Sequence, residues 1–362
     1  MSIILFFLIL LLLVVAHEFG HFIVAKKAGI RVDEFAFGFP PKIYGKKFGE
    51  TTYSFNALPL GGYVKIYGEN PSDVSDHDRK RSFASQPRVI QAGVVIAGIV
   101  FNILLAWILL SLVLMIGIPA SVDSEDGAAV RAPKLMITDT AKLGPAAVSG
   151  IVAGDIIKSV SDGTQTVQAT SPDVVSGFIG PRVGVPLTIA YDHKGEIKQA
   201  VITPIMGISQ KGAAIGIYMD MVGTLQYSFF PAILHGGEKT YLYTKLTAVG
   251  IYDFIRTAVI GRADFSQVTG PVGIVNAVGE AAGLGLANLI LFTALISINL
   301  AVINVLPFPA LDGGRLLFII IEAITRKPMK ASISNSLNFA GFALLMLLMI
   351  AVTWHDIAKL MH

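Results

Sequence analysis

Residues 2–25 read SIILFFLILLLLVVAHEFGHFIVA, an apolar run that is interrupted by ionisable side chains at His17, Glu18 and His21. A stretch of roughly 20 apolar residues is long enough to cross a bilayer as a helix. No basic residue precedes the run and no small-residue cleavage site follows it, so we interpret it as a membrane span and not as a signal peptide. Ionisable groups inside a span are costly unless they are paired or functional. The run therefore predicts a functional site within the membrane.

The composition also indicates a membrane protein. Of the 362 residues, 53% are hydrophobic and 15% are charged, whereas soluble domains carry about 25% charged residues. The mean hydropathy is +0.67. Three further apolar stretches predict spans at 89–118, 284–306 and 337–354. The net charge of +3 without a basic stripe argues against a nucleic-acid partner, and the absence of cysteine excludes disulfides and thiolate metal sites.

Basic residues set the expected orientation of the spans. They crowd the segment after the first span, precede the second, and fill the short loop that we expect between the third and the fourth: Lys26, Lys27, Arg31, Lys42, Lys46, Lys47, Lys65, Arg79, Lys80, Arg81, Arg88, Arg315, Arg326, Lys327 and Lys330. Segments rich in lysine and arginine next to spans stay in the cytoplasm. We therefore expect both termini, and residues 119–283, to lie outside the cytoplasm.

The pattern along the chain divides it into 1–118 with the first two spans, 119–222 as an external domain, 223–283 as an amphipathic segment, and 284–362 with the last two spans. Aromatic alternation around Pro59 and Gly61-Gly62 predicts strand, turn and strand at 51–67. The external domain is predicted as α+β from a short helix at 172–179 and β-rich runs at 156–160, 186–191, 199–203 and 214–219. Residues 225–261 are typical of a helix lying on a membrane surface, and a Gly-Pro-Val-Gly turn follows at 270–273.

The run His17-Glu18-Phe19-Gly20-His21 has the His-Glu-x-x-His spacing. On a helix, positions i and i+4 share one face, so both imidazoles can bind one metal ion while Glu18 faces the water bound to it. A catalytic zinc has three protein ligands and an open position for water, so this motif requires one more ligand. A chance match on an ordinary helix is the alternative, and three ionisable residues in one span argue against it.

Asp312 is the expected third ligand. His21 lies five positions before Lys26, which places it about 7–8 Å from the cytoplasmic edge at 1.5 Å per residue. Asp312 lies three positions before Arg315, at the cytoplasmic end of the third span. The surrounding segment from Asn304 to Gly314 holds two prolines and two glycines, which break a helix and expose backbone groups. A membrane tolerates that beside protein or a water-filled cavity.

Several motifs in order along the chain resemble the site-2 protease family of intramembrane zinc metalloproteases, and within it the bacterial regulators of sigma-E type. The matching stretches are His17 to His21, 58–64 (LPLGGYV), Ala97-Gly98 to Asn102, Gly270 to Ile274 and Asn304 to Gly314. The resemblance implies one zinc ion held by His17, His21 and Asp312, with Glu18 as general base. It also implies a bacterial inner-membrane enzyme whose active site lies toward the cytoplasm.

The same resemblance implies further roles. Residues 51–67 would form a membrane-reentrant β-loop whose edge, with Gly61, Gly62, Tyr63 and Val64, pairs with an unwound substrate. Asn304, Pro307 and Pro309 would handle substrate. Asn102 can take part in the site or form an interhelical hydrogen bond, and the residues leave both readings open.

The external domain resembles a PDZ domain in circularly permuted order. The likeness rests on Gly144 to Ala147, Gly150 to Ile157, and a carboxylate-binding loop that contains Gly212, Ile215, Gly216 and Ile217. The expected fold is therefore a polytopic α-helical membrane protein with four spans, a reentrant β-loop and one external PDZ-like domain.

The expected activity is hydrolysis of peptide bonds within or near single transmembrane spans. By resemblance, the substrates are anti-sigma factors already shortened by an upstream site-1 protease, or leftover signal peptides, and the bilayer is a constant partner. Two other functions remain open from the sequence: a zinc carrier, which needs no Glu18, and an inactive membrane scaffold that uses the PDZ-like domain.

Overall fold

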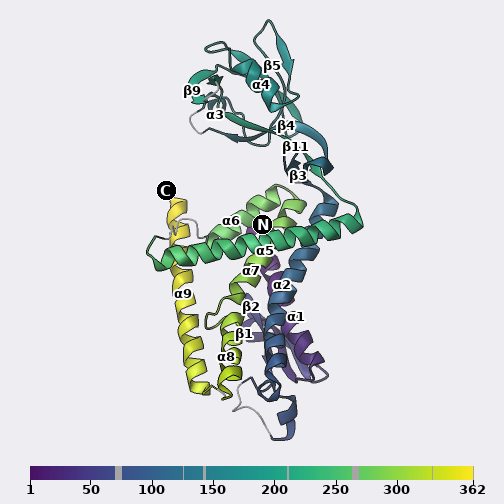
Figure 1. Ribbon diagram of the computed structural model, residues 1–362, viewed down its shortest axis with the longest axis vertical. Coiled ribbons are helices and arrows are strands. Elements are labelled where there is room, and N and C mark those ends of the chain that lie inside the picture. The colour runs from purple at the N-terminus through teal and green to yellow at the C-terminus, as the bar shows by residue number, and fades with distance from the viewer. Residues whose placement is uncertain are drawn as a thin grey trace. The chain divides into compact units, whose positions relative to one another are not determined.

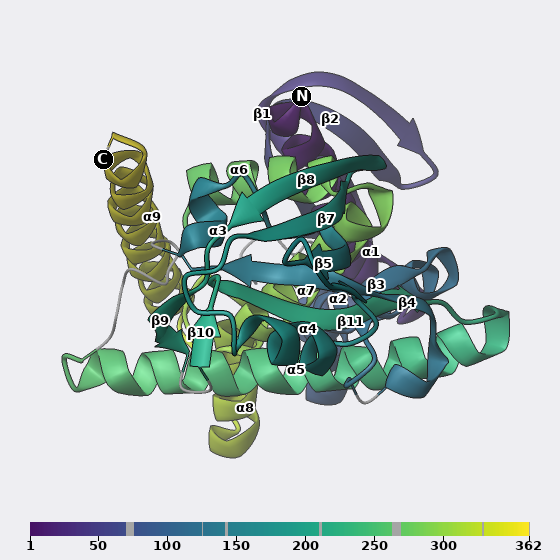
Figure 2. The same ribbon diagram turned by 90° about the horizontal axis from the view of Figure 1, so that it is seen from above.

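The computed structural model describes residues 1–69, 76–124, 126–141, 144–209, 212–262, 269–327 and 329–361. It forms two compact units, one from Met1–Val113 with Phe230–His362 and one from Leu114–Phe229. Figures 1 and 2 show the first unit as mainly helical and the second as mainly β-sheet.

Within the described residues, four helices are long and apolar enough to cross a membrane. They are α1 (Ser2–Lys27), α2 (Arg88–Ile116), α7 (Leu286–Val305) and most of α9 (Ala331–Met361). Helices α1 and α2 approach closely at Gly20, where a Cβ would lie 2.4 Å from the Ala97 carbonyl oxygen. Only 6% of the most apolar 18-residue stretch of α9 is buried by other parts of the described chain, so most of this helix presents an exposed apolar surface.

The short loop expected between the last two spans is instead a helix, α8 (Asp312–Thr325), and that prediction was wrong. The basic residues at both ends suggested a loop, but the apolar run Leu316–Ile321 between them packs as a helix. Arg88 at the start of α2 fixes α8 through an ion pair with Glu322 at 2.7 Å.

The expected turn at 270–273 is also helical, because Gly270 and Pro271 begin α6 (Pro271–Gly283). Proline suits the first helical position, where its missing N–H has no partner to lose. Asp356 of α9 accepts hydrogen bonds from the Gly270 and Gly273 amides at 3.3 and 2.9 Å, which satisfies two free donors of the first turn.

A β-sheet follows α1, made by β1 (Val32–Phe48) and β2 (Thr51–Ile66). Residues 34–37 pair with 52–55 on one side and with 62–65 on the other, so the two bent strands form four short segments. In this pairing, residues 62–66 form an edge with one strand neighbour. Glu50, in the turn between β1 and β2, accepts hydrogen bonds from Lys26 of α1 and from Arg81. These bonds attach the turn to α1 and hold the pKa of Glu50 below its usual value.

One carboxylate connects all four segments of this sheet. Glu34 accepts hydrogen bonds from Lys42 at 3.0 Å, from Ser54 at 2.5 Å and from the Tyr63 hydroxyl at 3.1 Å. The edge segment is thereby fastened to the rest of the sheet through Tyr63. Two short 3₁₀ helices, Asp76–Arg81 and Phe83–Ser85, lead from the sheet to α2.

The long helix α5 (Phe229–Val259) crosses the spans at a steep angle in Figure 1. The Trp107 indole donates a hydrogen bond to the Ile233 carbonyl at 2.8 Å. A Cβ at Gly236 would lie 2.2 Å from Ser111 Oγ, so α5 touches α2 backbone to backbone there. The amphipathic helix predicted at 225–261 is therefore present, and one face of it packs on the spans.

The unit at 114–229 holds a seven-stranded sheet in its described part, in the order β3-β11-β4-β5-β7-β8 with β6 paired to β5 (Figure 2). These strands are β3 (Ile118–Ser121), β4 (Val130–Thr140), β5 (Ile156–Ser161), β6 (Thr166–Gln168), β7 (Leu187–His193), β8 (Glu196–Ile202) and β11 (Ile217–Leu225). The hairpin β9 (Ile205–Ser209) with β10 (Gly212–Ala214) and the helices α3 (Pro145–Val148) and α4 (Pro172–Ile179) complete the unit.

The core of this unit lies between the sheet and α4. Leu135, Ile157, Val175, Leu187 and Ile189 are among its buried members, each at most 2% exposed. Ser171 caps α4 by accepting a hydrogen bond from the Val174 amide at 3.3 Å. The short helix predicted at 172–179 has these same bounds in the structure.

Candidate metal centre

Three predicted metal ligands converge within the helical unit. His17 Nε2 and His21 Nε2 lie 3.2 Å apart on one face of α1. Asp312, the first residue of α8, places its Oδ2 atom 3.1 Å from His17 Nε2 and 3.3 Å from His21 Nε2. Residues nearly three hundred positions apart in the chain thus present three ligand atoms to one point.

The spacing of these atoms fits zinc. Two atoms bonded at 2.0–2.1 Å to one tetrahedral ion lie about 3.3 Å apart, which matches the triangle of 3.1, 3.2 and 3.3 Å. Asp312 Oδ2 is buried, and neither imidazole nitrogen reaches it with hydrogen-bond geometry. A buried carboxylate oxygen without a donor, beside two imidazole nitrogens, is a suitable donor set for a cation.

Helix α2 supports the two histidines. His21 Nδ1 lies 2.8 Å from the Val94 carbonyl oxygen, which can only accept, so Nδ1 carries the proton and Nε2 keeps its lone pair. A Cβ at Gly98 would lie 2.3 Å from His21 Nε2 and 2.8 Å from His17 Cε1. Gly98 therefore leaves the space that both rings occupy. Sequence reasoning assigned no role to Val94 or Gly98, although their i, i+4 spacing places them on one face.

The three ligands open onto a cavity of about 610 Å³. It is lined by His17, Glu18, His21, Tyr63, Val64, Lys65, Ile66, Glu69, Val94, Val95, Asn304, Ala310, Asp312 and Arg315. The edge segment of β2 forms one wall, where the Val64 amide lies next to the Glu18 carboxylate. Arg315, which the sequence analysis used only to orient the spans, forms an ion pair with Glu69 at the cavity wall.

The other residues predicted for substrate contact lie at different distances from this cavity. Asn304 lines it, and Gly62 packs beside it, since a Cβ there would lie 3.6 Å from Glu18 Cγ. Gly61 lies against the ring of Phe39. Pro307 and Pro309 lie in the bend between α7 and α8 and are not among the lining residues.

The bend brings Asp312 into place because two glycines follow it. A Cβ at Gly313 would lie 2.2 Å from the Leu306 carbonyl oxygen, and one at Gly314 would lie 2.2 Å from the Phe308 carbonyl oxygen. Larger side chains at either position would push α8 away from the end of α7. The glycines therefore position the aspartate, while the prolines turn the chain.

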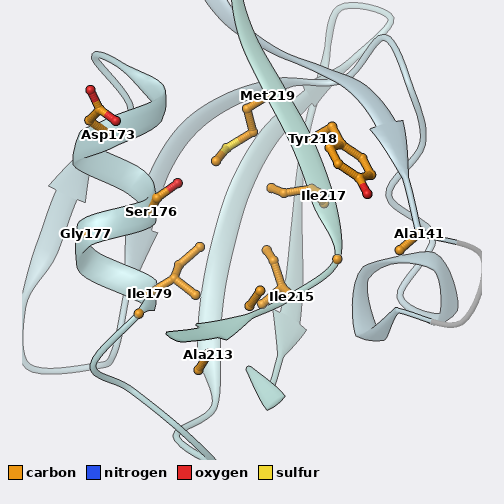
Figure 3. A pocket seen from close by; sticks show the side chains of 13 residues that line it. Ala141, Asp173, Ser176, Gly177, Ile179, Ala213, Ile215, Ile217, Tyr218 and Met219 are labelled. Atoms are coloured by element: carbon orange, nitrogen blue, oxygen red, sulfur yellow. The ribbon is translucent and has the colours of Figure 1, made fainter. Parts of the chain in front are cut away.

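A second cavity, of about 510 Å³, lies in the 114–229 unit between α4 and the start of β11. Figure 3 shows Ile179 of α4 facing Ile215 and Ile217 across this space, with Ser176 and Asp173 farther along the helix. Gly216 also lines it, whereas Gly212 begins β10 beside Gly180. Residues 217–221 of β11 pair with β4 on one side, and the pairing with β3 starts at Val222.

Comparison with known proteins places the chain in a family. The model of peptidase family M50 matches residues 5–348. The regulator of sigma-W protease RasP of Bacillus subtilis is 30% identical over 438 aligned residues, covering 99% of each chain. The zinc metalloprotease RasP of Shouchella clausii is 29% identical and covers 98% of each chain. A protein of Clostridium acetobutylicum is 34% identical over 95% of this chain and 94% of its own length.

A solved structure also matches a smaller part. The crystal structure of the PDZ domain of an SdrC-like protein from Listeria monocytogenes is 28% identical and covers 24% of this chain and 86% of its own, with a TM-score of 0.21.

The family match spans most of the chain and includes the His-Glu-x-x-His helix and Asp312. The predicted metalloprotease activity and the predicted zinc ion are confirmed by this membership. The apolar helices agree with a protein that resides in a membrane. The chain therefore belongs to peptidase family M50 and is a membrane zinc metalloprotease.

Proposed function

We propose that this metalloprotease cuts single transmembrane spans inside the membrane, at the cavity formed by α1, α8 and the edge of β2. The observation that carries the proposal is the position of the three ligand atoms. Two lie on α1, which is apolar enough to cross a bilayer, and the third begins α8, directly after the bend that follows the apolar helix α7. They lie beside an edge of β2 that has one strand partner among the described residues.

His17, His21 and Asp312 would hold the zinc ion. When bound, zinc polarises a substrate carbonyl and makes a water molecule acidic enough to be deprotonated near neutral pH. Glu18 lines the same cavity as the three ligands, so its carboxylate would take a proton from the attacking water and hand it to the leaving amine nitrogen. Asn304, with Pro307 and Pro309 in the bend beside it, would contact the substrate chain.

The edge segment 62–66, which follows Gly61, would bind the substrate by adding it as a further strand. A transmembrane helix hides its peptide bonds in its own hydrogen bonds, so it must unwind before cleavage. Val64 lines the cavity next to Glu18, and its amide would donate to a substrate carbonyl there. Strand addition would therefore lay the scissile bond beside the ligands.

The organisation of the chain fits this function in the membrane of a bacterium. We propose both termini and the 119–222 domain outside the cytoplasm, with the metal site toward the cytoplasmic side, because the basic segments flank that side. The regions 1–118 and 284–362 would form the proteolytic core. The segment 223–283 would lie on the extracytoplasmic surface of the same membrane.

The 119–222 domain would act as a PDZ-like module. Its cavity lies between α4 and a strand segment with one described neighbour, which is the arrangement that accepts a peptide as an added strand. Ile215, Gly216 and Ile217 line that cavity, and Gly212 begins the strand before them.

The substrates would be membrane proteins shortened by an upstream protease, such as anti-sigma factors, or leftover signal peptides. The name of the Bacillus subtilis relative, a regulator of sigma-W, favours the first class. The domain outside the membrane would keep intact external domains away from the core by their bulk.

Two reporters with the same span test this function. One carries a short external tail and the other a folded external domain, and each is incorporated into liposomes with the purified protein. We expect cleavage within the span of the short-tailed reporter, mapped by mass spectrometry, with loss of cleavage on chelation and recovery on addition of zinc. Equal cleavage of both reporters, or a cut only outside the span, would contradict the proposal.

Replacing Val64 by proline tests strand addition. Proline removes the amide next to the Glu18 carboxylate but leaves the pairing of 62–65 with 34–37 on the other side of the segment. We expect Val64→Pro to lower reporter cleavage at least tenfold, as the loss of a buried backbone hydrogen bond predicts, while bound zinc is unchanged. Val64→Ala keeps the amide and is the matched control. Equal cleavage by the two variants would rule out pairing at this residue.

A further inference from the structure

Asn102 lies beside the metal centre without lining its cavity. It is on α2, one turn beyond Gly98, and its exposed fraction is 0%. Its side-chain Nδ2 lies 3.2 Å from His17 Nδ1, and its Oδ1 is buried without a hydrogen-bond partner. Ser297 of α7 donates a hydrogen bond to its backbone carbonyl at 2.8 Å. A fully buried amide with an unmatched oxygen next to a ligand histidine calls for an explanation.

The chemistry of His17 decides which amide atom faces it. A neutral imidazole has one nitrogen that donates and one that accepts. His17 Nε2 points at Asp312 and His21, so as a metal ligand it must offer its lone pair and the proton must be on Nδ1. An N–H at Nδ1 needs an acceptor, and the amide nitrogen of Asn102 can only donate. Rotating the amide by half a turn places Oδ1 at this contact without changing the shape of the side chain.

The same rule is already met at the second histidine. The Val94 carbonyl accepts from His21 Nδ1, and Val94, Gly98 and Asn102 follow one another at four-residue spacing on one face of α2. This face of α2 therefore presents the Val94 carbonyl as one acceptor, the open space at Gly98, and the Asn102 amide oxygen as a second acceptor to the two imidazole rings. The main chain serves His21, and a side chain serves His17.

We propose that Asn102 is a positioning residue for the zinc ligand His17, with its Oδ1 accepting the Nδ1 proton. It fixes the ring in the tautomer whose Nε2 binds zinc, and it fixes the direction of that lone pair. This inference rests on the ligand set of the proposed function. The side chain of Asn102 thus belongs to the metal site, and its contact with α7 is made by its backbone carbonyl, which accepts the hydrogen bond from Ser297.

The test compares two replacements of similar size. Asn102→Leu removes the acceptor, and Asn102→Asp keeps an oxygen at the same place. Zinc affinity is measured by competition with a chelator on detergent-purified protein, together with the thermal midpoint. We expect Asn102→Leu to weaken zinc binding about 10- to 100-fold, the usual effect of losing such a partner, and Asn102→Asp to stay near wild type. Ser297→Ala, which removes the hydrogen bond to the Asn102 backbone, is the matched control and should bind zinc as the wild type does.

Each outcome has a defined meaning. Wild-type affinity in Asn102→Leu, or affinity as weak in Asn102→Asp as in Asn102→Leu, overturns the inference. If the leucine variant fails to fold, Asn102→Ala removes the amide without adding bulk and carries the same expectation. His17→Ala is measured in parallel. Retention of zinc by that variant would refute the ligand set itself, whereas its loss of zinc with no effect of Asn102→Leu would refute the role of Asn102 alone.

Discussion

Replacing Glu18 by glutamine should leave zinc bound and reduce cleavage of a single-span reporter by about 10²- to 10⁴-fold, the usual contribution of a general base. Glutamine has the shape of glutamate but does not take up a proton from water. The ligands His17, His21 and Asp312 are unchanged by this replacement. The measurement is initial cleavage rate in liposomes beside the zinc content of the same preparation.

A matched control has the same charge change elsewhere in the helical unit. Glu238 on α5 is 61% exposed and lies outside the cavity, so Glu238→Gln should cleave the reporter at the wild-type rate. Full activity of Glu18→Gln with zinc retained would refute the role of Glu18. Loss of zinc from Glu18→Gln would instead mean that Glu18 supports metal binding.

The second large effect is expected at Gly98. A Cβ at this position would lie 2.3 Å from His21 Nε2, the atom proposed to bind zinc, and a valine adds two further methyl groups there. Atoms that close must separate, so α1 and α2 move apart or both rings turn away. We expect Gly98→Val to lose zinc on purification, measured by elemental analysis, and to cleave no reporter.

Gly93 provides the control on the same helix. No atom outside its own neighbourhood lies within 4 Å of a Cβ built there, and the residue is exposed. Gly93→Val makes the same change in helix propensity and should retain zinc and activity. A Gly98→Val protein that holds a full equivalent of zinc would show that the rings do not need this space.

The sequence allowed the two histidines to be proposed as ligands from a local rule, whereas Asp312 was proposed from the expected topology and the family resemblance. His17 and His21 share a helical face at four-residue spacing, and the basic residues placed Asp312 at the same depth. The helix at 172–179 was equally accessible, since Ser171 and Pro172 are strong start signals. Two-residue signals of this kind need no knowledge of distant partners.

Features that depend on distant partners were not predicted. The strand at 32–48 alternates only at Phe35, Phe37 and Phe39 and is then interrupted by Pro40 and Pro41. It continues because 34–37 pairs on both sides with β2 and 42–48 pairs back on 51–56. The helix at 312–325 begins with Asp-Gly-Gly, which reads as a turn until the packing against the end of α7 is known. The contact of Asn102 with His17 spans 85 positions, and spacing along the chain gives no sign of it.

The close approach of α1 and α2 at Gly20 and Gly98 has a consequence for the choice of ion. Both histidines lie on α1, and the contacts at Gly20 and Gly98 hold their rings close against α2, so the rings have little room to turn away from Asp312. A calcium ion binds six to eight oxygen atoms at 2.3–2.6 Å and would require a wider ring of ligands. The two glycines thus help to keep the three proposed ligand atoms 3.1–3.3 Å apart, a spacing that suits a small ion with nitrogen ligands and discriminates against larger ions.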